Sequence, residues 1–99
     1  MDINNKRITS IEFSDNEMAC KIEDAILVLD YLKENKKIVL GGDILNKYRE
    51  YNYDNWYYNI DLNYDIRFNL ETSHKKAKEY LANYIQRNGD DFYVLFVID

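Results

Sequence analysis

The sequence predicts a small α+β domain in which two main amphipathic helices pack on a mixed or antiparallel sheet of about four strands. Three observations predict this class. Apolar residues recur at helical spacing over 14–34 and 73–88. They alternate with polar residues over 55–71, and an unbroken apolar run closes the chain at 92–98. A chain of 99 residues has room for one modest core, so we expect a single domain over residues 1–99.

The first third of the chain predicts an N-terminal arm followed by a helix. Residues 1–13 fit neither helical nor strand period, which indicates a short helix or an irregular arm. Ser14 and Glu17 then have the spacing of a capping box at the start of a helix over 14–34. Its apolar stripe consists of Met18, Ile22, Ala25, Ile26, Leu29 and Leu32.

A second apolar strip lies roughly opposite that stripe on the predicted helix and consists of Cys20, Leu27 and Tyr31. The favoured interpretation is that the N-terminal arm covers it, because apolar side chains are usually buried within the same domain. The alternative is a homodimer contact through these three residues. We expect a monomer.

The segment 38–46 predicts a buried strand that contains Gly41 and Gly42. One interpretation of the glycine pair is a phosphate cradle, but the spacing and the terminal Lys-Ser/Thr of a P-loop are absent, and no GxGxxG motif is present. A glycine bend or bulge is the simpler interpretation, because glycine tolerates positive φ and the close approach of a neighbouring backbone.

Residues 56–71 show strict two-residue periodicity, with apolar side chains at even positions and polar ones at odd positions. This pattern indicates strand with one buried face, on which Trp56 lies. A single strand of this length would run roughly 50 Å, too long for so small a domain. We therefore predict a hairpin over 55–71, with its strands paired within 56–70 and its loop around 61–63.

The last third predicts a helix and then a central strand. Thr72 or Ser73 is expected to cap a helix over 73–88, whose apolar stripe is Ala77, Tyr80, Leu81, Tyr84 and Ile85. The run 92–98 is rich in β-branched and aromatic residues, which is typical of a central strand covered on both faces. Truncating it is expected to unfold the protein.

Aromatic and acidic residues are concentrated between residues 38 and 71. Six of the ten tyrosines and the only tryptophan fall there, and Glu50–Asp65 contains four carboxylates and no lysine or arginine. Tyrosine, tryptophan and charged groups are typical of protein-binding hot spots, and a negative surface attracts a basic partner. We therefore expect a partner-binding surface formed by Asp43, Glu50, Tyr51, Tyr53, Asp54, Tyr57, Asp61 and Asp65.

Charge and composition argue against several other classes of function. A net charge of −5 disfavours direct binding to nucleic acid or to anionic lipid. The single cysteine excludes an internal disulfide and a cysteine cluster for zinc. The N-terminus lacks the features of a secretion signal, and no apolar run is long enough for a membrane span, so we expect a cytoplasmic protein.

No pattern in the sequence indicates catalysis. His74, the only histidine, is expected to be a solvated residue at a helix start, and its pairing with Cys20 in a nucleophilic site is a remote alternative. Asp61 and Asp65 could together bind a divalent cation across the hairpin, but turn and surface roles explain them more simply. We expect no enzymatic activity, no catalytic residue, no cofactor and no metal.

Four short motifs occur in a distinctive order along the chain: VLGGDILN at 39–46, Asp-Asn-Trp-Tyr at 54–57, Ser73 followed by A-x-x-Y-L at 77–81, and FYVLFV at 92–97. Together they resemble the immunity protein 40 family of bacterial polymorphic toxin systems of the contact-dependent inhibition type. The similarity covers roughly residues 20–98.

The resemblance implies a cytoplasmic protein that binds and neutralises a cognate toxin delivered by a neighbouring cell. It transfers no catalytic residue. A nuclease toxin is favoured, because an enzyme that binds a phosphate backbone has a basic cleft that carboxylates can occupy. The alternative, from a different class, is a small ligand-binding or regulatory domain with an aromatic pocket.

Overall fold

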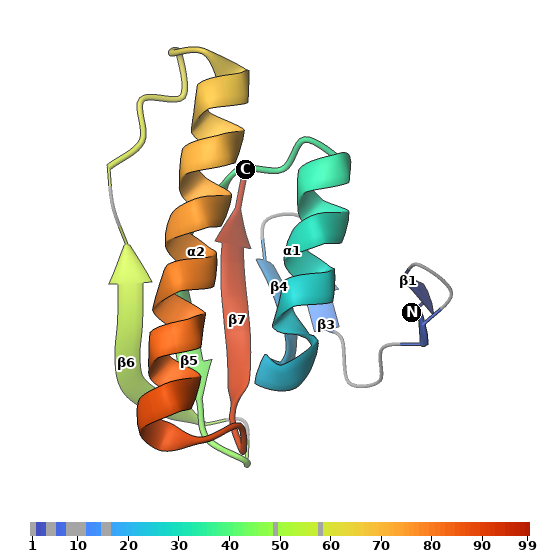
Figure 1. The fold of residues 1–99 in the computed structure, drawn as a ribbon, viewed down its shortest axis with the longest axis vertical. Coiled ribbons are helices and arrows are strands. Elements are labelled where there is room, and N and C mark those ends of the chain that lie inside the picture. The colour runs from blue at the N-terminus through green and yellow to red at the C-terminus, as the bar shows by residue number, and fades with distance from the viewer. Residues whose placement is uncertain (1, 4–5, 8–11, 15–16, 49, 58) are drawn as a thin grey trace.

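The computed structural model describes residues 2–3, 6–7, 12–14, 17–48, 50–57 and 59–99. The elements follow the order β1 (Asp2–Ile3), β2 (Lys6–Arg7), β3 (Glu12–Ser14), β4 (Glu17–Lys21), the short 3-10 helix η1 (Ile22–Asp24), α1 (Ala25–Glu34), β5 (Val39–Leu45), β6 (Tyr51–Tyr57), α2 (Ile66–Asn88) and β7 (Tyr93–Ile98). Figure 1 shows both α-helices on the same side of the sheet. The predicted α+β class, with two helices on an antiparallel sheet, is confirmed.

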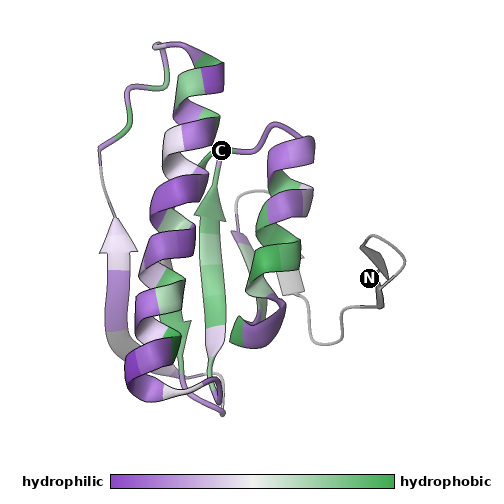
Figure 2. Ribbon diagram, viewed as in Figure 1, coloured by the Kyte–Doolittle hydropathy of each residue, from purple (hydrophilic) through white to green (hydrophobic). Residues whose placement is uncertain are grey.

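Within the described ranges, five strands form the main sheet in the order β3-β4-β7-β5-β6, and every neighbouring pair is antiparallel. β1 and β2 pair separately as a two-stranded sheet. β7 is central, and its apolar colour contrasts with the polar outer side of α2 in Figure 2. The core lies between this sheet and the helices.

Only one face of β7 is fully covered. Val94, Phe96 and Ile98 are buried on the helix side, whereas the alternate residues of the strand are half-buried. The prediction of a strand covered on both faces is therefore wrong. An unbroken apolar run usually marks such a strand, but here its second face belongs to a sheet surface that no described helix covers.

Residues 17–21 form a strand, so the predicted helix over 14–34 is wrong before residue 22. Ser14 and Glu17 lie opposite each other in the β3–β4 pair and do not form a capping box. Met18 and Cys20 face the core, opposite Phe96 and Val94 of β7. Residues spaced by two share one face of a strand but lie on opposite sides of a helix, so the shared burial of Met18 and Cys20 fits a strand and not the predicted helix.

The start of the chain contains strands where a short helix or irregular arm was predicted over 1–13, and the rest of that arm lies outside the described residues. β1 lies beside α1. The suggested dimer strip does not exist as one surface, because Cys20 belongs to β4 and is fully buried. Leu27 and Tyr31 remain on α1, partly buried against the core.

The predicted hairpin over 55–71, paired within 56–70, does not form. β6 ends at Tyr57, and α2 begins at Ile66, earlier than the predicted 73–88 helix. The cap is Asp65, whose Oδ1 accepts a hydrogen bond from the Phe68 amide at 2.9 Å, and neither Thr72 nor Ser73 has that role. The buried residues of α2 follow helical spacing: Asn69, Ser73, His74, Ala77, Leu81 and Tyr84.

The two glycines of β5 make room for Trp56, which lies on the buried side as its parity predicted. A Cβ on Gly41 would collide with the Trp56 carbonyl oxygen, and one on Gly42 would collide with the Trp56 ring. The β5–β7 register shifts between Val39 and Gly41, so a bulge is present as well. The indole then stacks on Tyr80, with ring centroids 4.7 Å apart.

Candidate functional site

Seven of the eight residues of the predicted partner-binding surface have described side chains, and these lie in four different places. Asp43, Tyr51 and Tyr57 belong to β5 and β6, on the side of the sheet away from the helices. Asp61 and Asp65 precede α2 at the opposite end of the molecule from the β5–β6 turn. Glu50 lies at that turn and Asp54 on the helix side of β6, whereas the Tyr53 side chain is outside what the structure describes.

The register of the sheet defines the first of these places. Because side chains alternate along a strand, Tyr93, Leu95 and Val97 point away from the helices. Residues directly opposite in the register share that face. We call the resulting set the open face; it consists of Glu17, Ala19, Lys21, Asp43, Leu45, Tyr51, Asn55, Tyr57, Tyr93, Leu95 and Val97.

The open face has apolar residues at its centre, with phenol and carboxylate groups beside them. Leu95 and Val97 are half-buried at its centre, and Tyr51 and Tyr57 are 62% and 51% exposed. The Tyr57 hydroxyl donates a hydrogen bond to Asp43 Oδ2 at 2.8 Å. This bond fixes the orientation of the ring over Gly41, which leaves it room.

The environment of Tyr57 shows which groups surround it. Burial raises the pKa of its phenol, the hydrogen bond and the charge of Asp43 raise it further, and nearby Tyr51 and Glu17 add to the effect. Tyr57 is therefore a neutral hydrogen-bond donor at physiological pH. Glu17 was assigned to a helix cap in the sequence analysis, and its place on this face was missed. The signal was the alternation of Glu17, Ala19 and Lys21 with buried neighbours.

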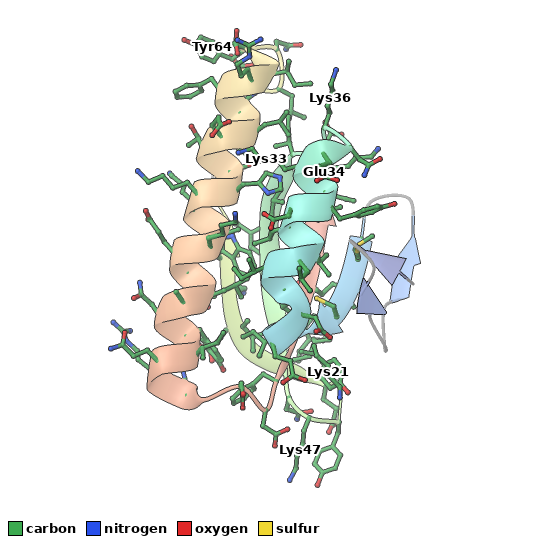
Figure 3. All side chains as sticks on the ribbon, turned by 45° about the vertical axis from the view of Figure 1, so that its right-hand side comes forward. Lys21, Lys33, Glu34, Lys36, Lys47 and Tyr64 are labelled. Carbon is green, nitrogen blue, oxygen red and sulfur yellow. The ribbon has the colours of Figure 1, made fainter. Side chains whose placement is uncertain are left out.

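A second exposed surface lies at the N-terminal end of α2. Leu62, Tyr64, Ile66 and Phe68 are each between 47% and 60% exposed, and we call these four residues the tip. Figure 3 shows Tyr64 at the end of α2 remote from Lys21 and Lys47. Its ring meets that of Phe68 edge to face, with centroids 5.3 Å apart.

The two carboxylates beside the tip have local structural roles. Asp61 Oδ1 accepts a hydrogen bond from the Asn63 amide at 3.0 Å, and Asp65 caps α2. The buried Asn69 donates its side-chain N–H to the Asp61 carbonyl at 2.8 Å, which ties this turn to the helix. Among the described residues, no group of three or more His, Cys, Asp or Glu side chains could hold a metal ion.

Glu50 and Asp54 lie outside the open face, at the β5–β6 turn and on the helix side of β6. The Glu50 amide donates to Asn46 Oδ1 at 3.1 Å, and its carbonyl accepts from the Asn46 amide at 2.7 Å, which closes the β5–β6 turn. Asp54 is exposed and accepts a hydrogen bond from the Tyr84 hydroxyl at 3.3 Å. Burial raises the pKa of Tyr80, and the Asp54 charge raises it further.

The two residues considered for catalysis are both buried. His74 is only 2% exposed, so the prediction of a solvated residue at a helix start is wrong. It lies well inside α2, and its Nε2 is 3.0 Å from the Lys37 carbonyl oxygen. Burial raises the pKa of the Cys20 thiol, and the charge of Asp24 raises it further, so the group is a poor nucleophile at neutral pH.

Two hollows of the described surface differ in the side chains that line them. A hollow of about 620 Å³ between α1 and α2 is lined by polar and charged side chains: Lys33, Glu71, Thr72, His74, Lys75, Lys76, Lys78 and Glu79. Tyr64 and Phe68 line a smaller one at the tip. Trp56 and Tyr84 belong to the core, and Tyr80 packs against it.

The fold defines the protein as a small α+β domain with two helices on an antiparallel sheet. The family model described as Immunity protein 40 matches residues 7–98. The chain therefore belongs to the Immunity protein 40 family, and it is an immunity protein against a toxin, as its four motifs suggested. No curated protein and no solved structure matches it. No helix in the described part of the chain is long and apolar enough to cross a bilayer.

Proposed function

We propose that this immunity protein neutralises its cognate toxin by binding it tightly through the open face, and that it performs no chemistry of its own. The observation that carries the proposal is the one-sided packing of the helices. It leaves Leu95 and Val97 partly accessible in the middle of the sheet, with Asp43 and Tyr57 beside them.

Each component of the open face has a role in this binding. The partly accessible Leu95 and Val97 supply apolar area, and Tyr51 and Tyr57 supply the large rings that anchor protein interfaces. The bond between Tyr57 and Asp43 orders the ring before the partner arrives, which lowers the entropy cost of association. Glu17 and Asp43 attract a basic partner.

The partner we favour is a nuclease toxin, because its substrate-binding cleft must be basic to hold a phosphate backbone. Glu50 and Asp54 are further candidates for contact with the toxin, at the β5–β6 turn and along the edge strand, and Tyr53 stays a candidate on its sequence alone. The protein would act in the cytoplasm of a bacterium engaged in contact-dependent growth inhibition, as a monomer until the toxin binds. Asp61 and Asp65 are secondary candidates, because each carboxylate already accepts a backbone hydrogen bond. The donor to Asp61 is the Asn63 amide in the turn before α2, and the donor to Asp65 is the Phe68 amide in α2.

The test reverses charge on the open face. The double variant Glu17→Lys, Asp43→Lys is compared with Glu34→Lys, Glu79→Lys, which makes the same change in net charge at exposed positions on the helices. With the toxin encoded by the neighbouring gene, we expect the open-face variant to associate roughly tenfold more slowly at low salt and to lose growth protection. The helix variant should behave as wild type.

A tip variant separates the two exposed surfaces. Tyr64→Ser with Phe68→Ser removes the paired rings at the end of α2, and we expect it to retain protection. If this variant abolishes protection while the open-face variant preserves it, the toxin docks on the tip and the proposal is overturned. Circular dichroism of all three double variants checks that they are folded.

A further inference from the structure

β6 forms an outer edge of the sheet. Within the described chain it is the terminal strand of the order β3-β4-β7-β5-β6, so its other side pairs with no described strand. β1 lies beyond α1, on the opposite side of the molecule from β6 (Figure 1). The backbone groups that β6 directs outward are therefore open to an approaching chain.

The hydrogen bonds at the ends of β5 and β7 show which backbone groups these are. Ile38 and Asp99 exchange both backbone hydrogen bonds, with N···O distances of 3.0 and 2.9 Å. The direction of the backbone hydrogen bonds alternates along an antiparallel strand. Since Asp99 bonds toward β5, so do Val97, Leu95 and Tyr93 of β7. Their register partners Gly41, Asp43 and Leu45 direct their own backbone groups toward β7.

The same alternation extends to the edge. Gly42 directs its backbone groups toward β6, and Trp56 opposite it directs its groups back toward β5. Asn55 and Tyr57, on either side of Trp56, therefore point their N–H and C=O groups away from the sheet. Both side chains are exposed.

The last three residues of β6, 55–57, lack the protection that edge strands usually have. Natural proteins block such edges with lysine, proline or a bulge, because an open edge can pair with another strand. Residues 50–57 contain no lysine, no arginine and no proline. The β5–β6 register is irregular between Asp43 and Leu45, which leaves 55–57 as the regular end of the strand.

We propose that the cognate toxin adds a basic β-strand to the outer edge of β6, bonding to the backbone N–H and C=O of Asn55 and Tyr57. The inference rests on the proposed function and specifies how the toxin is held. Strand addition gives affinity through main-chain bonds, and alternate side chains give specificity. One face of the added strand would extend the open face next to Tyr57, where basic side chains would meet the field of Asp43 and Glu17.

Charge favours the toxin over a second copy of this chain as the occupant. Each copy of this chain carries a net charge of −5, and residues 50–57 hold two carboxylates, Glu50 and Asp54, and no basic residue. Like charges across paired strands are destabilising. A strand with lysine or arginine at alternate positions has the complementary charge.

The test removes one N–H group from the edge. Asn55→Pro deletes the outward N–H and places a ring in the path of an added strand, and it keeps the β5–β6 bonds because that N–H does not face β5. Asn55→Ala is the matched control, since it loses the same side chain and keeps the N–H. The affinity of the alanine variant for the toxin domain is the reference, because this variant lacks the same side chain. The proline variant should bind at least tenfold more weakly, with an unchanged circular dichroism spectrum.

Amide hydrogen exchange provides a measurement on the unmodified protein. In the complex with the toxin domain, the amides of Asn55 and Tyr57 should exchange at least tenfold more slowly than in the free chain, whereas the Trp56 amide is already protected. Unchanged exchange at Asn55 and Tyr57 would overturn the proposal even if the proline variant failed to fold.

The remaining outcomes are distinct from one another. Equal affinity of the proline and alanine variants overturns strand addition and leaves toxin neutralisation intact. Failure of the wild-type chain to bind or protect refutes the proposed function itself. A free chain that is a dimer by light scattering, and that Asn55→Pro converts to a monomer, makes a second copy the occupant and overturns the assignment to the toxin.

Discussion

His74 is a buried base that faces groups from two helices. Burial is the main cause that lowers its pKa. The hydrogen bond with the Lys37 carbonyl acts in the opposite direction, as does Asp30, whereas the charges of Lys33 and Lys78 lower the pKa further. Because the Lys37 carbonyl can only accept, Nε2 carries the proton in the neutral ring.

This arrangement predicts acid sensitivity in a defined window. The pKa of His74 is lower in the folded state than in the unfolded chain, so the unfolded state binds more protons and stability falls as pH drops below about 6.5. One such group contributes at most about 1.4 kcal/mol per pH unit. Urea unfolding between pH 7.5 and 5 measures the slope, which His74→Gln should flatten. An identical slope in both proteins would show that another group is responsible.

Single residues of this chain were the hardest part to predict from sequence. The pattern around His74 is polar, with lysines on one side and a hydroxyl on the other, and nothing in it indicates burial. The residue is inside because Ser73 and His74 meet the β5 end of the sheet, where Ser73 Oγ accepts from the Val39 amide at 3.3 Å. Such a contact depends on residues 34 positions apart.

Among the elements, the start of α2 was the largest error. The strict alternation of apolar and polar residues over 56–71 fits a long strand. It does not exclude a strand followed by a loop and a helix, which is what the structure has. The deciding feature was the turn formed by Asp61 and the cap formed by Asp65, followed by a helix whose first buried residue is the polar Asn69. β5, the later part of α2 and β7 all lie where the sequence placed them, because their apolar residues face the core.

The cap gives a prediction at the scale of the helix. Asp65→Ala removes the acceptor for the Phe68 amide and should lower the free energy of unfolding by about 1 kcal/mol. The control Glu71→Ala breaks an exposed ion pair with Lys33, whose N···O distance is 3.1 Å, and should cost less than about 0.5 kcal/mol. Denaturant titration measures both.

This pair of variants also tests what Asp65 does for the toxin. If Asp65→Ala lowers stability and leaves the affinity for the toxin unchanged, the carboxylate has only its structural role. A loss of affinity without a loss of stability would instead make it a contact residue, which is what the sequence pattern predicts.

At the scale of the whole molecule, the fold depends on pairing between the C-terminal strand β7 and β4, which lies in the first quarter of the chain. β7 lies between β4 and β5, so the sheet closes only after residue 97 meets residue 17. The sequence indicated a central C-terminal strand from its composition. It could not indicate which strands would flank it, because pairing partners are chosen by tertiary packing.

Removing 93–99 should therefore abolish cooperative unfolding, because β4 and β5 lose their shared neighbour. The matched deletion of residues 1–7 removes β1 and β2, which form a separate sheet, and should leave a cooperative transition. Thermal unfolding followed by circular dichroism compares the two. A cooperative transition in the C-terminal deletion would mean that the remaining strands are sufficient.

The candidate site was predictable in composition and only partly in location. The concentration of phenols and carboxylates was visible in the sequence, and Asp43, Tyr51 and Tyr57 do share a face. Glu17 was missed because it lies 26 positions before Asp43 in the chain and only the sheet brings the two strands to one side. Asp61 and Asp65 were misplaced together with the hairpin that was expected to carry them.

The one-sided packing of the helices has an evolutionary consequence. Positions such as Tyr51 and Asn55 are exposed on the outer side of β6, and substitutions at such surface positions usually change stability by no more than about 0.5 kcal/mol. When the sequence of the toxin changes, the immunity protein can therefore accumulate compensating substitutions at these exposed positions one at a time. The architecture beneath them stays intact throughout.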